Sequence, residues 1–220
     1  MKKEYIFKLI TKKEDKEAVL EYLTKERKIA GKTYISSYYS CLVHARTATG
    51  REANSGLLKN KNNIGNWPGA FMYMVLIDHI GGIFEVGNKT KGENKFLKAL
   101  SNFSNLSDDN AKTLYQLRNS LFHSFCLYDF PRNEKLFTPR VFTVHRGNRL
   151  IDFPSKDWDG NATIKKENIT YISLFKIGEL AEKMHKNILE SLNNDTLEVR
   201  IPKDGDFTVE KILKINTLCY

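Results

Sequence analysis

The feature that most constrains the fold is an apolar run over residues 70–84, which follows the helix-start signal Trp67-Pro68-Gly69. The helix predicted for this run carries apolar side chains on nearly every face, among them Met72, Val75, Leu76, Ile80 and Ile83. Such a helix must lie at the centre of a core or in an oligomer interface. The adjacent pair Gly81-Gly82 either lets another helix approach closely or kinks this one.

Helical patterns also dominate the rest of the chain. Helices are predicted over residues 12–30, 33–49, 93–103 and 163–192, with a further one beginning at the capping signal Ser107-Asp108-Asp109. These segments predict a mainly α protein, an antiparallel bundle whose core comprises residues of about 12–130 together with the helix 163–192. Since the chain has neither internal repeats nor a low-complexity linker, residues 1–220 are expected to form a single domain.

Two segments have the alternating pattern of strands. Phe142, Val144, Ile151 and Phe153 alternate around Gly147-Asn148, which predicts a β-hairpin over residues of about 140–154. Residues 197–201 read as a strand followed by a turn at 203–205, whereas residues 207–215 fit either a strand or a helix. We expect the hairpin and the C-terminal segment 197–220 to decorate the outside of the bundle.

Composition indicates which partners and which redox environment suit the protein. The excess of 35 Lys and Arg over 26 Asp and Glu gives a net charge of +9, which favours polyanionic partners, although biased codon usage produces the same excess. Lysines in the polar loop 51–68 could steer an RNA backbone or simply be solvated. Cys41, Cys126 and Cys219 are far apart, which favours reduced thiols over a disulfide framework or zinc site.

No part of the sequence predicts a membrane or secreted protein. Residues 1–17 lack the uninterrupted apolar core of a secretion signal. The apolar run at residues 71–84 is too short to cross a bilayer and contains Asp78 and His79, which we interpret as polar side chains satisfied within a packed interface. The expected location is therefore the cytoplasm.

The most informative polar residues lie in the helix predicted around residues 114–125. Leu114, Leu121 and Phe125 fall on one apolar stripe, and Arg118 lies in the middle of it. Burying a guanidinium there costs several kcal/mol unless an anion or a hydrogen-bond acceptor meets it. Asn119 and His123 are four residues apart on another face, where they could hydrogen-bond each other.

Arg118, Asn119 and His123 form an Arg–polar–spacer–His pattern that resembles the motif of the HEPN superfamily. Those proteins are helical bundles, many of them metal-independent ribonucleases of toxin–antitoxin, abortive-infection and CRISPR systems. The resemblance implies a HEPN-like bundle, RNA as the substrate, no cofactor and no metal. It assigns proton transfer to His123, stabilisation of the phosphorane to Arg118, and a role to Asn119 in orienting His123 or contacting phosphate, leaving a 2′,3′-cyclic phosphate and a 5′-hydroxyl.

A regulatory tyrosine of some relatives is replaced here. A subset of the superfamily carries, two residues after the histidine, a Tyr that a partner nucleotidyltransferase antitoxin adenylylates, and this chain has Phe125 there. That route of regulation is therefore not expected, and an antitoxin or defence-system partner stays unidentified.

Helix geometry requires a second copy for catalysis. Residues five apart in a helix are separated by about 140° around the axis and about 7.5 Å along it, so Arg118 and His123 do not converge within one helix. Two helices meeting across a two-fold axis would form a composite site, and a homodimer is therefore expected. Three alternatives stay open at this point: a ribonuclease, a catalytically silent HEPN-like module that binds nucleic acid or protein, and a helical scaffold with an accidental motif. Under the last, Arg118 is a salt-bridge partner and His123 an exposed helix residue, the surface or structural role that we also expect for His44.

Overall fold

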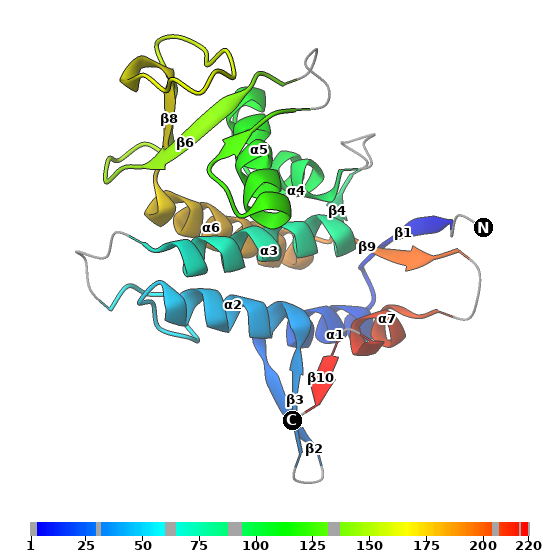
Figure 1. Ribbon diagram of the computed structural model, residues 1–220. Helices are drawn as coiled ribbons and strands as arrows, with labels where there is room; N and C mark the ends of the chain where they lie inside the picture. The colour runs from blue at the N-terminus through cyan, green and yellow to red at the C-terminus, as the bar shows by residue number, and fades with distance from the viewer. Residues whose placement is uncertain are drawn as a thin grey trace.

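A long apolar helix lies at the centre of the molecule. The structure is a computed structural model that describes residues 4–29, 32–59, 65–87, 94–131, 137–203, 207–215 and 217–219. Helix α3 (Trp67–Ile83) contacts α2 (Ser37–Ala48), α4 (Lys95–Phe103), α5 (Asp108–Ser124) and α6 (Leu174–Asn193). In Figure 1, α3 runs across the middle, with α2 below it and α4 and α5 above it. The prediction of a central helix is confirmed.

A glycine sets the distance between α3 and α4. A Cβ placed on Gly81 would lie 1.8 Å from the carbonyl oxygen of Lys95, so only a hydrogen in that position allows the two helices to come this close. The helix continues unbroken to Ile83. Of the two roles considered for Gly81-Gly82, close approach is the one that the structure has.

Seven helices occur among the described residues, which confirms a mainly α protein. The remaining two are α1 (Lys13–Thr24) and α7 (Val209–Ile215), which contact each other. Residues 207–215, left open by the sequence, therefore form a helix in their larger part. Buried side chains from Ile10 to Leu213 belong to one core cluster. No helix within the described ranges is long and apolar enough to cross a membrane.

The first two predicted helices are shorter than expected because strands replace their ends. Helix α1 ends at Thr24, and the strands β2 (Glu26–Ile29) and β3 (Lys32–Ser36) pair antiparallel, with β10 (Thr217–Cys219) on the other side of β3. Ser36 then begins α2, because its side chain accepts a hydrogen bond from the backbone N–H of Tyr39. This cap lies inside the segment 33–49 that was predicted as one helix. The residues before it are therefore not helical and form the extended strand β3.

The C-terminal segment is part of the core rather than a decoration. Strand β9 (Leu197–Pro202) lies between β1 (Tyr5–Leu9) and β4 (Phe84–Val86) in an antiparallel sheet, with Tyr5 opposite Pro202. Leu197 and Val199 are fully buried. The strand itself is confirmed, but its predicted position outside the bundle is wrong, because its apolar side chains alternate onto one face that packs against the helices. The predicted turn falls partly on residues 204–206, which lie outside the described residues.

The predicted hairpin around Gly147 is wrong. Its two strands exist as β6 (Arg140–Val144) and β7 (Ile151–Asp152), but β8 (Ile169–Ile172) lies between them. β8 pairs parallel with β6 and antiparallel with β7, and β5 (Tyr128–Asp129) completes the sheet on the other side of β6. The helix predicted over residues 163–192 is confirmed only in its later part, as α6, which begins after the Ser173 cap. Residues 163–172 do not belong to it; they contain a short 3-10 turn, η1 (Lys166–Asn168), followed by β8. Phe142 and Ile151 are buried in the core cluster, so this sheet too is more than a decoration.

Candidate functional site

The helix that carries the motif is turned differently from the prediction. Ser107 caps α5 through the backbone N–H of Asn110 at 3.4 Å, as its sequence indicated. Its buried face, however, consists of Thr113, Leu114, Gln116, Leu117 and Ser120. Among these, Gln116 and Ser120 form hydrogen bonds with residues of the adjacent sheet, so the burial of their polar groups costs little free energy. Phe125, expected on the buried stripe, has a left-handed backbone (φ 50°) at the end of the helix and is 85% exposed.

Arg118 lies at the edge of that buried face and meets an anion, as predicted. Its Nε and Nη2 donate to Oδ2 of Asp78 on α3 at 2.8 and 2.5 Å, and both side chains are about one-fifth exposed. Its Nη1 donates to Oδ1 of Asn119 at 3.1 Å. The guanidinium carbon lies 4.5 Å from the ring centre of Phe122, which adds a cation–π contact. A guanidinium has five N–H donors, so two are left for a ligand.

The three motif residues line one groove. Arg118, Asn119 and His123 share it with Asp78, and the groove has a volume of about 920 Å³. His123 is exposed and reaches the groove from the last turn of α5. The hydrogen bond that Asn119 and His123 could have formed is not among those of the described residues; the Asn119 oxygen accepts from Arg118. The groove therefore holds an oriented cation and a solvent-accessible imidazole.

The groove is also lined by Asp129, a carboxyl group that sequence reasoning missed. Asp129 Oδ2 accepts a hydrogen bond from Gln116 Nε2 at 2.9 Å, and that nitrogen also donates to the Thr138 carbonyl at 2.8 Å. Arg140 Nε donates to Gln116 Oε1 at 3.1 Å. Burial raises the pKa of Asp129, although the bond from Gln116 opposes the shift. Nothing in the spacing of Gln116 and Asp129 marked them, since their link depends on how β5 packs against α5.

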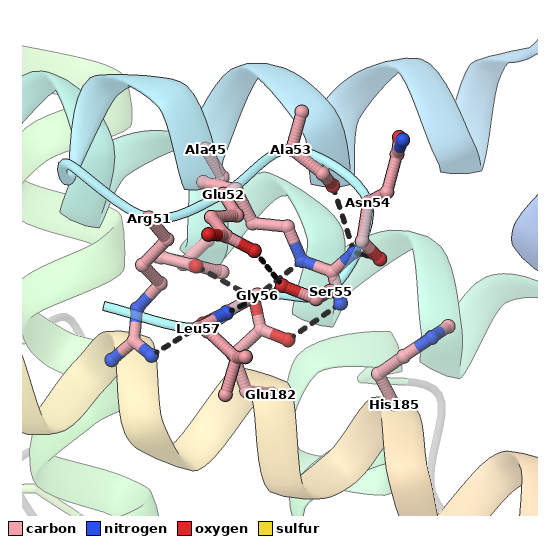
Figure 2. Close-up of polar contacts among 12 residues, drawn as sticks. Ala45, Arg51, Glu52, Ala53, Asn54, Ser55, Gly56, Leu57, Glu182 and His185 are labelled. Carbon is pink, nitrogen blue, oxygen red and sulfur yellow. Dashed lines mark hydrogen bonds and ion pairs between the residues drawn. The ribbon is translucent and has the colours of Figure 1, made fainter. Parts of the chain in front are cut away.

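A second buried polar network lies away from the groove, and its charged groups bond one another. Arg46 on α2 donates to both carboxylate oxygens of Glu182 on α6, at 2.9 and 2.7 Å, and its Nη1 donates to the carbonyls of Ala53 and Asn54 (Figure 2). The hydroxyl of Tyr73 donates to Glu182 at 2.8 Å. This network ties the described part of the polar loop, up to residue 59, to the three helices α2, α3 and α6. Residues 60–64 of this loop, which include Lys61, lie outside the described residues.

Three further histidines have structural or surface positions. His79 shares a 2.6 Å hydrogen bond with the Tyr22 hydroxyl, and His185 a 2.8 Å bond with the Tyr38 hydroxyl; burial lowers the pKa of both imidazoles to about 4. His44 is exposed and bonds its own helix at the Ser40 carbonyl, as expected for a surface residue.

Within the described ranges, no three His, Cys, Asp or Glu side chains gather as a metal site. Cys41 and Cys126 are free thiols, and burial raises the pKa of Cys41 to about 12. The side chain of Cys219 lies outside what the structure describes.

Comparison with known proteins gives no match, whether to protein-family models, to curated proteins or to solved structures.

Proposed function

We propose that the chain is a metal-independent endoribonuclease of HEPN type, acting in the cytoplasm as a toxin or antiphage effector. One observation carries the proposal: Arg118, Asn119 and His123, which match the motif, all line the same groove. The groove thus combines the two groups that metal-free RNA cleavage needs, a proton carrier and a cation beside the phosphorus.

The chemistry assigns a separate task to each side chain. The imidazole of His123 takes the proton from the 2′-hydroxyl, the 2′-oxygen attacks the adjacent phosphorus, and the 5′-oxygen leaves with a proton given back by the imidazolium. The planar guanidinium of Arg118 stabilises the phosphorane through its remaining N–H donors. Asp78 holds two of the guanidinium nitrogens, so Arg118 is oriented before RNA binds. Asn119 fixes a third nitrogen.

The proposed site is completed by a second copy of the chain. Arg118 and His123 project about 140° apart around α5, and a two-fold axis would bring the Arg of one copy towards the His of the other. We therefore expect a homodimer with α5 at its interface. A monomer in sedimentation equilibrium at tens of micromolar would argue against this composite site.

The test is RNA cleavage in excess EDTA with single-stranded RNA, followed by analysis of the product ends. Wild type should leave cyclic phosphates, and His123→Ala should lower the rate by roughly 10²–10⁴-fold. Arg118→Lys should not retain activity, because an ammonium lacks the planar fork of donors. His44→Ala is the matched control, since His44 is an exposed helical histidine outside the groove, and it should cut like wild type.

A second candidate, a catalytically silent HEPN-like module that binds nucleic acid or protein, rests on the Asp78 contact. An aspartate that neutralises Arg118 is also what a purely structural arginine would have. Inert wild-type protein that still binds RNA would favour this candidate. His123→Ala and Arg118→Ala variants that both cut at the wild-type rate would move the chemistry away from these residues.

A further inference from the structure

Two aromatic rings stand exposed at the edge of the groove. Tyr128 and Phe130 both line it, and they are 49% and 54% exposed. Along an extended strand, alternate side chains project to opposite faces. Asp129, between them in the chain, is held by Gln116 of α5, and the rings of Tyr128 and Phe130 lie against each other beside it.

The ring of Phe130 is fixed by its surroundings although half of it is exposed. Its centre lies 4.9 Å from that of Trp158, which is buried and donates its indole N–H to the carbonyl of Asn161 at 3.0 Å. Gly160 lies so close that a Cβ there would be 2.9 Å from the Phe130 ring. Tyr128 completes the group, with its ring centre 5.5 Å from that of Phe130 in an edge-to-face arrangement. These contacts hold the rings in place before any ligand arrives.

We propose that Tyr128 and Phe130 stack on unpaired bases of single-stranded RNA while Arg118 contacts the backbone. The proposal rests on the ribonuclease function above and names the form of RNA that the groove takes. Aromatic rings beside a cation are the combination that binds single strands, because every base has a π-face and every linkage a negative charge. The net charge of +9 favours the same partner. In a duplex the base faces are covered by their neighbours, so paired RNA cannot use these rings.

The binding experiment uses full-length His123→Ala protein, so that RNA is not cut, and an oligoadenylate of about ten nucleotides containing 2-aminopurine. Fluorescence anisotropy gives the Kd, and stacking on the rings should change the emission of the 2-aminopurine. Phe130→Leu and Tyr128→Leu keep an apolar side chain but remove the π-face. Each should raise the Kd by roughly 5- to 150-fold, and the same sequence as a duplex should bind at least about tenfold more weakly than the single strand.

Two further variants make the result specific. Phe130→Tyr keeps the ring and should bind as the parent does, which separates stacking from damage to the fold. Phe207→Leu is the matched control, because Phe207 is 37% exposed and lies just before α7, a helix that is far from β6 and β8 in Figure 1. It should leave the Kd unchanged.

The outcomes separate this inference from the proposed function. Leucine variants that bind single strands like the parent, or a duplex that binds equally well, would overturn the stacking proposal while cleavage by wild type still supported the ribonuclease. Leucine variants that dissociate a dimer without changing the 2-aminopurine signal would overturn it as well, by assigning the rings to a protein interface. Ring-dependent binding without any cleavage would support the inference and refute the ribonuclease.

Discussion

Two neighbouring glycines at the end of α3 should respond in opposite ways to the same substitution. Gly81 faces α4, and an alanine Cβ there would lie 1.8 Å from the Lys95 carbonyl oxygen and 2.7 Å from its carbon. Gly82 faces outward, and an alanine Cβ there would meet nothing nearer than the Lys95 Cδ at 3.5 Å. Gly81→Ala should therefore destabilise the protein, and Gly82→Ala should stabilise it slightly.

The size of each effect follows from these distances. To reach an ordinary contact distance of about 3.4 Å from 1.8 Å, the start of α4 must move away by roughly 1.6 Å, and α4 also carries the buried Phe96, Leu100 and Phe103. Overpacking of this kind costs about 1–3 kcal/mol, and the upper end applies because the obstacle is backbone. Gly82→Ala instead removes the backbone entropy of a helical glycine, a gain of about 0.5–1 kcal/mol.

Urea unfolding followed by far-UV circular dichroism measures both variants against wild type. The two midpoints should lie on opposite sides of the wild-type midpoint with similar slopes, and the thermal midpoints should differ by roughly 5–15 °C for a chain of this size. Shifts of the same sign, or a Gly81→Ala variant as stable as wild type, would refute the idea that the α3–α4 distance depends on this glycine.

Two further predictions concern buried charge. Arg46→Met should lower the free energy of unfolding by about 3–5 kcal/mol, because it leaves the Glu182 carboxylate buried without its cation. Lys186→Met removes an exposed ion pair with Glu190 on α6, the helix of Glu182, and should change the free energy of unfolding in urea by less than about 1 kcal/mol. Equal losses in the two variants would contradict this reasoning. Stability should also fall on acidification: the folded pKa values of His79 and His185, about 4, lie below the unfolded value, so the unfolded state takes up protons first as the pH falls below about 6.5. Between about pH 7 and pH 5 each should cost about 2 kcal/mol, and a thermal midpoint that does not fall over this range would rule out neutral buried imidazoles.

The sequence was most informative where one element alone decides the structure. An apolar run without a polar face requires a central position, and α3 has it. The Ser107 cap and the start of α5 likewise depend on adjacent residues only. The prediction of strands was less successful because strands depend on distant partners. Residues 169–172 form a short apolar run that fits a helix or a strand, and only their pairing with β6 and β7 decides between the two.

The candidate site shows the same division. That Arg118 needs an anion was predictable from its own helix, but the choice of Asp78 depends on how α3 and α5 pack. The rotation of α5 was misjudged because the prediction counted only apolar residues. Gln116 and Ser120 are buried, and each has a hydrogen-bond partner near β5, a compensation that no periodicity of α5 reveals.

The pairing of β1 with β9 determines when the first sheet can form during synthesis. Tyr5 lies opposite Pro202, so β1 cannot pair with β9 until residues 197–202 have left the ribosome. At about 5–20 residues per second this delay amounts to roughly 10–40 s. During that time Ile6 and Leu9, which stay partly exposed even in the finished sheet, belong to an unpaired strand that can meet other nascent chains. A slow, non-local closing step of this kind makes the yield of folded protein depend on translation rate and on chaperones that shield the N-terminal strand.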